Sequence, residues 1–324
     1  MRIERFAPVA DQTTVRACYD IYLAAHHADD PGGPVMAAET FQGWIAQGWT
    51  CWPRQAALAT DSAPTGWYLL DLPENSPHGL TLVTVVPSRR REGIGTALLR
   101  CAAQAARDHD RTQLGLQART GSPGEAFAVA AGARSGMAES RYALDLTTLS
   151  RARLSQLRPR AAGYTLLRWT GPVPDEHLGQ VAAINSALSD APHDDVEEEL
   201  HWDIQQVRNA NQRILSRNLR CYSVAARHLA SGKLVGLTQA SVAPADASWG
   251  TQELTVVVGP HRGRRLGMLL KVALLQLLPE REPDLRLLIT WTADSNVHMN
   301  AINRALGFEV LDRWTGFSLP LGVT

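Results

Sequence analysis

The chain has 324 residues, of which 45% are hydrophobic, and its 32 Lys and Arg side chains are balanced by 32 Asp and Glu side chains. That length suits two domains, each with a sizeable core. The charge balance gives no global electrostatic case for a nucleic-acid-binding protein.

The first half of the chain alternates strands and helices. Period-two patterning and β-branched residues predict strands at residues 2–7, 52–59, 66–72, 80–86, 113–117 and 141–146. Apolar residues at helical spacing predict helices at residues 13–25, 37–47, 96–108 and 124–131. The turn-forming residues of 26–34 predict a loop after the first helix.

The second half repeats this order after a charged segment, 149–160, so we place the domain boundary near Ser150. Strands are predicted at residues 164–169, 221–228, 234–240, 252–258, 285–290 and 313–319. Helices are predicted at 176–188, 196–219, 268–278 and 296–306, with a loop at 189–195. The sequence therefore predicts a mixed α/β chain of two domains, 1–150 and 151–324, instead of one purely parallel sheet.

Targeting and redox signals are weak. The cysteines form no Cys-x-x-Cys pair, which favours reduced structural thiols at Cys18, Cys51, Cys101 and Cys221. No apolar run follows the first residues, and the segment 268–278 is too short to span a bilayer. We therefore expect a cytoplasmic protein without a membrane segment, either a monomer or a homodimer.

One stretch in each half has the pattern of strand, basic loop and helix. In the first half, the β-branched run ending at Val86 is followed by a basic loop and a helix that opens after Gly95. A helix N-terminus presents unpaired N–H groups, so this loop is suited to an anion. The stretch 256–271 repeats the pattern, and aligning Arg90 with Arg262 gives an offset of 262 − 90 = 172 residues.

Gly93 and Gly95 have other interpretations besides anion binding. A tight turn needs no ligand, but it leaves the neighbouring arginines and the repeat unexplained. A dinucleotide-binding loop needs a third glycine three residues after Gly95, where the chain has Leu98. The phosphate loop of nucleotidases needs Lys-Ser or Lys-Thr after the glycines, and the chain has neither there. The sequence favours a ligand-binding loop of another kind.

The motif Arg90-x-x-Gly93-x-Gly95, after a valine-rich strand, resembles the acyl-CoA-binding signature of the GNAT superfamily of N-acetyltransferases. The second copy, Arg262-x-x-Arg265-x-Gly267, departs from that signature in one glycine. Residues 296–308, which end in Leu-Gly-Phe, resemble the next motif of the superfamily. The resemblance covers the whole chain. It implies two tandem GNAT-like domains, each with a mixed, mostly antiparallel central sheet flanked by helices.

The resemblance also implies that acetyl-CoA is the acyl donor. Its diphosphate would rest on the N–H groups of the loop, its pantetheine arm would pair with the strand before the loop, and an amine would attack the thioester directly. The residues assigned in this way to the coenzyme are Val85, Arg90, Arg91, Gly93, Gly95 and Thr96 in the first half, and Val256, Val257, Val258, Arg262, Gly263, Arg264, Arg265, Leu266, Gly267, Met268 and Asn296 in the second.

The two halves depart from the family pattern in different places. Arg265 replaces a glycine in the second loop, which adds charge but restricts the backbone, so a degenerate second lobe is one interpretation. The first half lacks the asparagine of the later motif and has Gly132-Ala133 in place of Gly-Phe. We expect the C-terminal half to be catalytic and the N-terminal half to bind CoA poorly or to be structural.

Glu253 and Asn303 are the candidate catalytic residues. Glu253 precedes the strand that would pair with pantetheine, where GNAT enzymes often keep a carboxylate base; the alternative is a solvated strand residue. Asn303 stands where many of these enzymes have a tyrosine acid, and an amide can hydrogen-bond a sulfur but cannot deliver a proton. The acid is therefore unassigned, since Tyr222 fits core packing better. Asn296 is either a coenzyme contact or a helix N-cap.

Acidic residues lie in the segments that line the acceptor pocket in GNAT folds: 26–30, 193–195 and Glu197 to Glu199. They suit a cationic amine, although carboxylates also favour helix N-termini. His26, His27, Asp29 and Asp30 have no helical metal-ligand spacing, so no metal is expected. Trp44 and Trp202, at comparable places in the two repeats, are expected in cores.

The resulting hypothesis is an acyl-CoA-dependent N-acyltransferase that acts on a small-molecule amine, in antibiotic resistance or small-molecule biosynthesis. A non-catalytic CoA-binding sensor is the alternative from another class. A protein or peptide acetylase is a third, and the long first loops of both halves argue mildly against its open acceptor groove.

Overall fold

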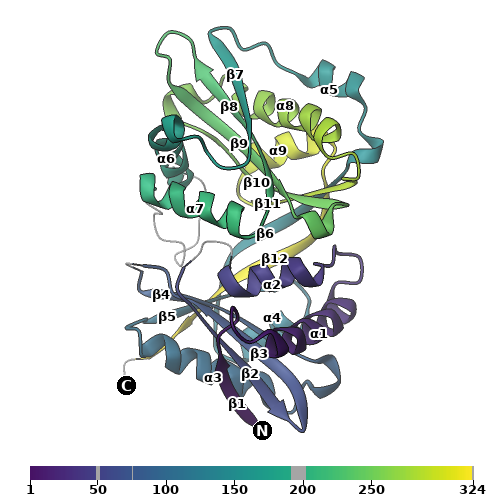
Figure 1. Cartoon of the computed structure of the whole chain (residues 1–324), viewed down its shortest axis with the longest axis vertical. Helices are drawn as coiled ribbons and strands as arrows, with labels where there is room; N and C mark the ends of the chain where they lie inside the picture. The colour runs from purple at the N-terminus through teal and green to yellow at the C-terminus, as the bar shows by residue number, and fades with distance from the viewer. Residues whose placement is uncertain (49–51, 75, 191–201, 323–324) are drawn as a thin grey trace. The chain divides into compact units, whose positions relative to one another are not determined.

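The computed structural model describes residues 1–48, 52–74, 76–190 and 202–322 (Figure 1). Its contacts divide the chain into two compact units. The N-terminal unit contains Met1–Ala138 and the C-terminal segment from Trp314, and the C-terminal unit lies between Glu139 and Arg313. The domain boundary near Ser150 stays a prediction.

The sheet of the N-terminal unit is mostly antiparallel. It contains β1 (Arg2–Phe6), β2 (Arg54–Asp61), β3 (Ala63–Asp71), β4 (His78–Val85) and β5 (Gln113–Arg119). The first four strands pair in chain order as antiparallel neighbours. β4 and β5 are parallel, and their pairing extends only from His78↔Gln113 to Leu80↔Gly115. β5 also pairs antiparallel with Trp314–Pro320, the second part of β12 (Glu309–Pro320).

Helices cover both faces of this sheet, because β3 is apolar on both. Trp67 and Leu69 pack with α1 (Gln12–Asp29) and α2 (Ala38–Gln47). Tyr68 and Leu70, which alternate with them, pack with α3 (Ile94–Arg107) on the other face. The last helix of the unit is α4 (Pro123–Ala130), whose Ala128 packs against Ala118 of β5.

The C-terminal unit repeats this topology. Its sheet contains β7 (Tyr164–Thr170), β8 (Arg220–His228), β9 (Leu234–Val242), β10 (Trp249–Val257) and β11 (Leu287–Ala293). β7 to β10 are antiparallel neighbours, and β10 and β11 are parallel only from Trp249↔Leu287 to Thr251↔Ile289. β11 pairs antiparallel with Glu139–Asp145 of β6 (Arg134–Asp145).

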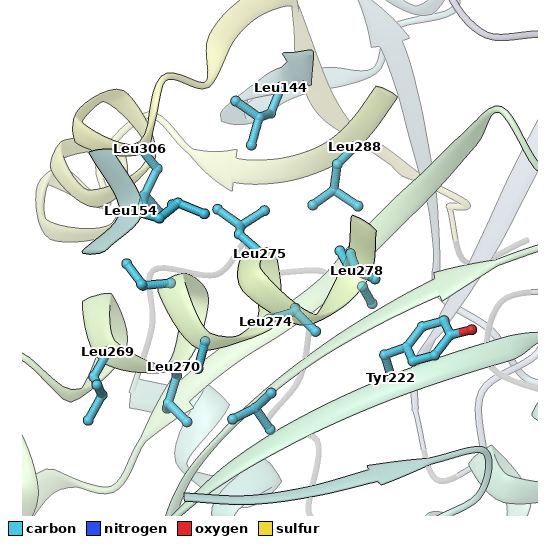
Figure 2. Packing of buried hydrophobic residues seen from close by; sticks show 14 of the residues in the cluster. Leu144, Leu154, Tyr222, Leu269, Leu270, Leu274, Leu275, Leu278, Leu288 and Leu306 are labelled. Atoms are coloured by element: carbon cyan, nitrogen blue, oxygen red, sulfur yellow. The ribbon is translucent and has the colours of Figure 1, made fainter. Parts of the chain in front are cut away.

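The helices of this unit, as far as the structure describes the chain, are α5 (Arg151–Leu157), α6 (Leu178–Ser186), α7 (Ile204–Ser216), α8 (Leu266–Arg281) and α9 (Val297–Leu306). α6 and α7 cover one face of the sheet, and α8 and α9 cover the other (Figure 1). Leucines of α8 pack between β8, β11, α5 and α9 (Figure 2). Each buried leucine contributes about 2 kcal/mol to the stability of the fold, so α8 is the centre of this core.

The last strand of each half completes a sheet made mainly by the other half of the sequence. Glu139–Asp145 of β6 lies beside β11, and Trp314–Pro320 of β12 lies beside β5. A sequence pattern predicts that a strand exists but not its pairing partner, so this exchange was not predicted. The predicted mixed α/β architecture, mostly antiparallel, is confirmed.

Several element boundaries differ from the predictions. The first helix continues through residues 26–29, because no Gly or Pro interrupts it before Pro31. The charged segment 149–160 contains α5, where Ser150 accepts a hydrogen bond from the N–H of Arg153. α8 runs past Pro279, whose missing N–H falls in the last turn.

The helix predicted at 196–219 is α7 among the described residues, and it begins at Ile204 with a capping box made by Asp203 and Gln206. Residues 191–201 lie outside the described residues. In the parts of the chain that are described, none of the helices combines the length and apolar character that crossing a bilayer requires.

Candidate active site

The two predicted anion loops have the same backbone conformation. Arg91 and Gly93 are left-handed in the first loop, with φ of 69° and 83°. Gly263 and Arg265 occupy the corresponding places in the second, with φ of 75° and 60°. Each loop thus has one glycine and one arginine at its two left-handed positions, in swapped order. Arg265 therefore leaves the shape of the loop unchanged, and each loop carries the strain of one left-handed arginine, about 1 kcal/mol.

Both loops lead into a helix start that lacks a side-chain cap. The N-cap residues are Gly93 for α3 and Arg265 for α8, and neither helix has a side-chain hydrogen bond at its N-cap. Among the residues that the structure describes, the N–H groups of the first turn, which includes Thr96 in α3 and Met268 in α8, have no acceptor. Such a start, with the positive end of the helix dipole, is suited to a phosphate.

Arg90 and Arg262 hold the loops to the strands before them. Nε of Arg90 donates to the carbonyl of Val85 at 3.3 Å, and Nε of Arg262 donates to that of Val257 at 2.9 Å. Arg90 also donates both terminal nitrogens to Asp29 of α1, at 2.8 and 2.7 Å. These two arginines, predicted as coenzyme ligands, therefore support the loop conformation.

The loops differ in how far their positive charge is compensated. In the first loop Arg89 pairs with Asp61 at 2.9 Å and with Glu92 at 2.8 Å, and Arg90 pairs with Asp29. None of the ion pairs found among the described residues involves Arg264 or Arg265, and both are exposed. The second loop is thus better able to attract a phosphorylated ligand.

Gly95 and Gly267 lie in the first turns of α3 and α8, facing the next helix of each unit. A Cβ on Gly95 would lie 3.4 Å from Cε2 of Phe127 in α4, which is an ordinary van der Waals contact. One on Gly267 would lie 3.3 Å from Cδ1 of Ile302 in α9, so the end of Ile302 would have to shift slightly. The assignment of both glycines to the coenzyme stays a prediction.

Each unit has a gap where its two parallel strands separate. In the C-terminal unit, the pairing of β10 with β11 ends at Thr251↔Ile289, whereas β10 continues to pair with β9 up to Val257. Among the described residues, Leu254–Val257 therefore has no strand partner on the β11 side. An extended ligand can add to such an open strand edge. Val256, Val257 and Val258 were predicted to lie here.

Glu253 lies at a β-bulge beside this gap. The register of β10 against β9 shifts between Gln252 and Leu254, and Glu253 is the extra residue. Its carboxylate accepts a hydrogen bond from Oγ of Ser241 on β9. The described pairing of β4 with β3 runs from Leu80 to Val85 without such a shift, so only the C-terminal unit shows this bulge.

Cys221 lies near Glu253 but is not a nucleophile. Burial, with the negative charge of Glu253 as a second cause, raises the pKa of the Cys221 thiol to about 12. The thiol therefore stays protonated at neutral pH. Three cysteines, Cys18, Cys101 and Cys221, are free in the described chain, and Cys51 lies outside it.

Asn303 is buried inside the unit. Its Oδ1 accepts a hydrogen bond from Nζ of Lys271 at 2.6 Å, and its Nδ2 donates to Oγ1 of Thr292 at 3.1 Å. Lys271, which the sequence analysis missed, is 1% exposed, and its Nζ lies 4.7 Å from the ring centroid of Phe308. Its signal in the sequence was a lysine within the apolar run of α8.

Asn296 and Tyr222 have structural contacts. Oδ1 of Asn296 accepts from the N–H of Met299 at 3.1 Å, which makes Asn296 the N-cap of α9. The hydroxyl of Tyr222 donates to Glu282 at 2.5 Å, and burial with this contact raises its pKa to about 12. Tyr222 is therefore a poor proton donor at neutral pH.

The acidic segments give a limited picture. Asp29 is paired with Arg90, and Nε2 of His26 lies 3.1 Å from the carbonyl oxygen of Gly33. Residues 193–195 and Glu197 to Glu199 lie outside the described residues. No group of three or more His, Cys, Asp or Glu that could hold a metal ion occurs in the described parts. Trp44 is buried among the aromatic side chains of its unit, and Trp202 is half-buried.

Comparison with known proteins supports a fold of two tandem domains. No protein-family model matches the sequence, and none of the curated proteins matches it. A solved tandem GNAT protein from the clavulanic acid biosynthesis pathway is similar over 100% of both chains, with 29% identity and a TM-score of 0.84.

Two further solved structures share the fold at lower identity. A GCN5-related N-acetyltransferase from Sphaerobacter thermophilus is 18% identical over 99% of this chain and 96% of its own, with a TM-score of 0.71. The glucosamine N-acetyltransferase region of a fungal multi-domain β-N-acetylglucosaminidase is 14% identical over 98% of this chain and 38% of its own, with a TM-score of 0.66. These two likenesses show the fold alone, whereas the 29% identical tandem GNAT protein, together with the repeated loops and the separated parallel strands, supports a tandem GNAT N-acetyltransferase.

Proposed function

We propose that the C-terminal unit transfers an acetyl group from acetyl-CoA to the amine of a small molecule. The observation that carries this proposal is the coincidence of three features in one unit. They are the exposed arginines Arg264 and Arg265, the open edge of β10, and the bulge that holds Glu253 beside that edge.

The residues present fit a CoA thioester. The uncapped start of α8 and the two arginines provide donors and charge for the diphosphate. The edge Leu254–Val257 offers main-chain hydrogen bonds to the amide groups of the pantetheine arm. When bound, the coenzyme supplies an acyl carbon that is open to attack by an amine.

Glu253 is the base in this proposal. Its carboxylate takes the proton that the amine nitrogen loses as it bonds to the acyl carbon, and Ser241 fixes its direction. A bulge turns a backbone N–H out of the ladder, and an N–H so placed stabilises charge that develops on the carbonyl oxygen. The carbon–sulfur bond then breaks and its electron pair leaves with the sulfur.

The N-terminal unit has the role of a scaffold or a weak CoA binder. Arg89 and Arg90 of its loop are paired with Asp29, Asp61 and Glu92, and the described pairing of β4 with β3, from Leu80 to Val85, shows no bulge. A phosphorylated ligand at this loop must displace the paired carboxylates before it can gain the attraction of these arginines.

The acceptor is a small molecule, as in antibiotic resistance or small-molecule biosynthesis. The similar tandem GNAT protein comes from the clavulanic acid biosynthesis pathway, which is a small-molecule pathway. That likeness covers the whole of both chains, and it therefore favours a small acceptor over a protein or peptide.

Thiol release from acetyl-CoA with a panel of small amines tests the proposal. We expect turnover with at least one amine, a loss of roughly 100-fold or more in Glu253→Gln, and unchanged acetyl-CoA affinity in that variant. Calorimetry should show a lower CoA affinity in Arg264→Ala, whereas Arg91→Ala, which also removes an exposed arginine but from the first loop, should bind as the wild type does. CoA binding without turnover would support a sensor, and failure to bind CoA would overturn both functions.

A further inference from the structure

A polar line crosses the core of the C-terminal unit beside the proposed site. It joins Lys271 of α8 to Asn303 of α9 at 2.6 Å and Asn303 to Thr292 of β11 at 3.1 Å. Lys271, Asn303 and Thr292 are all buried, at 1%, 0% and 6% exposure. Burying a charged group lowers stability unless it is paired with an opposite charge, so the buried Lys271 needs an explanation.

The N-terminal unit shows that the fold does not need this line. Lys271 corresponds to Leu99 under the offset of 172 residues, and Asn303 corresponds to Ala128 when the helices are aligned on Gly307 and Gly132. Thr292 lies three residues after the last parallel pair of β11, and Ala118 lies three residues after that of β5. Leu99, Ala128 and Ala118 are all apolar. The same backbone is thus stable with apolar side chains at all three positions.

The donors and acceptors of these three side chains fix the direction of the hydrogen bonds between them. A lysine ammonium has three donors and no acceptor, so Asn303 must turn its Oδ1 toward Lys271. The Nδ2 of Asn303 then faces Thr292 and donates to Oγ1. Thr292 Oγ1 therefore accepts a hydrogen bond from Asn303, and its hydroxyl proton is left to donate to a group other than Asn303. Among the residues that the structure describes, Thr292 has no hydrogen-bond acceptor for that proton.

Thr292 lies on the part of β11 that borders the gap. β11 separates from β10 after Ile289, and Glu253 sits where β10 bulges two residues after Thr251. A thioester held on the edge of β10 with its acyl carbon near Glu253 has its sulfur in this gap. Thr292 is on the side of the sheet where α8 and α9 pack, since it contacts Asn303. This is the position that the missing acid would occupy.

We propose that the Thr292 hydroxyl donates a hydrogen bond to the coenzyme sulfur as the thioester breaks, and that Lys271 and Asn303 are positioning residues that aim this hydroxyl. This inference rests on the proposed function of the same unit. The carbon–sulfur bond breaks, sulfur keeps the electron pair, and Thr292 keeps its proton while stabilising the thiolate. The amine proton taken by Glu253 returns to the thiolate through solvent, so the step is balanced.

The surroundings of Lys271 suit a group that acts through its charge. Burial lowers the pKa of its ammonium to about 7, and the ring of Phe308 below it favours the charged form. Glu282, the buried acid at the C-cap of α8, is paired with Arg220 and Tyr222. None of the ion pairs found among the described residues involves Lys271, so no carboxylate in an ion pair neutralises its ammonium there.

The thiol of bound CoA reports on this line directly, whether or not turnover occurs. Its pKa is measured from the ultraviolet absorption of the thiolate in a pH titration of the full chain with CoA, with desulfo-CoA as the reference. We expect Thr292→Val to raise the pKa of the bound thiol by about one, and Lys271→Met to raise it in the same direction. Thr292→Ser should restore the wild-type value, and Leu99→Met, the matched change in the N-terminal unit, should have no effect.

Kinetics provide the second measurement. With acetyl-CoA, Thr292→Val should lower kcat by roughly 10- to 100-fold with little change in KM, since a hydrogen bond to a charged group is lost only as charge develops. The loss of kcat in Thr292→Val should be smaller with an acetyl thioester whose thiol is more acidic than that of CoA. Unchanged desulfo-CoA affinity shows that each variant is folded.

Two results would overturn the inference. One is a bound thiol whose pKa is the same in the wild type and Thr292→Val. The other is a drop in kcat that is equal for both thioesters, which would assign Thr292 to support of the fold alone. If the wild type releases no thiol with any amine, the proposed function fails, whereas the thiol pKa still decides the role of Thr292.

Discussion

Replacing Lys271 by Met should make the stability of the protein less dependent on pH. Lys271 is buried with its ammonium 4.7 Å from the ring centroid of Phe308, and burial lowers its pKa from 10.5 to about 7. The unfolded chain therefore binds a proton that the folded chain resists between these two pH values. Stability of the wild type rises with pH in this window, and the cost of the lysine is fully present below about pH 7.

The magnitude follows from the size of this shift. A difference of 10.5 − 7, about 3.5, at about 1.36 kcal/mol each gives about 5 kcal/mol. Cation–π attraction to Phe308 opposes burial and returns up to about 2 kcal/mol, leaving about 3 kcal/mol. The Lys271→Met change would also leave Oδ1 of Asn303 without its donor, at a cost of about 1–3 kcal/mol at every pH.

Urea unfolding of both proteins at pH 7 and pH 10 measures this effect. The stability of Lys271→Met relative to the wild type should improve by about 2 kcal/mol from pH 10 to pH 7, because part of the cost is already present at pH 10, below the unfolded pKa. Leu99→Met is the control, and its effect should be the same at both pH values. A Lys271→Met effect that is also the same at both values would show that the lysine keeps an ordinary pKa, and the argument from burial would be wrong.

Three other changes have defined outcomes. Arg265→Gly should relieve the left-handed backbone and raise thermal stability by about 1 kcal/mol or less, yet weaken acetyl-CoA binding in calorimetry; Arg91→Gly should give the same stability gain without the loss of affinity, and equal affinities in both variants would contradict the charge argument. Asp71→Asn leaves the buried Arg54 without the carboxylate that it contacts at 2.5 Å, so it should destabilise the N-terminal unit by about 3 kcal/mol in urea unfolding, and a loss under about 1 kcal/mol would show that solvent reaches Arg54. A chain ending at Arg313 lacks the strand partner of β5, so light scattering should show aggregation, whereas a stable monomer would mean that the β5 edge needs no cover.

The sequence was sufficient for the repeated architecture because its signals are local. The two basic loops, the helix starts after them and the tandem division all follow from patterns within short stretches of the chain. Even the departure at Arg265 is local: the left-handed positions of one loop carry arginine then glycine, and those of the other carry glycine then arginine. Aligning the two loops could have shown that the backbone is the same.

The rest depends on contacts between distant residues. The exchange of β6 and β12 joins Asp145 to Leu287 and Trp314 to Arg119, pairings that no periodicity encodes. Lys271 meets Asn303 across 32 residues, so the interpretation of Asn303 as a residue facing the coenzyme could not include its actual neighbours. The bulge at Glu253 is also a relation between two strands, and the sequence of β10 alone does not show it.

The two units together separate what the fold requires from what chemistry requires. Both have the same loop conformation and the same divergence of parallel strands, so neither feature distinguishes a catalytic unit from a scaffold. The two units differ at the loop and in the core. The N-terminal unit pairs Arg89 and Arg90 with carboxylates and has leucine or alanine at the three corresponding core positions, whereas the C-terminal unit exposes Arg264 and Arg265 and buries a lysine. A buried cation without a carboxylate partner lowers stability, and Leu99 shows that an apolar side chain serves at the corresponding place. The destabilising choice is therefore best explained by the site that it adjoins.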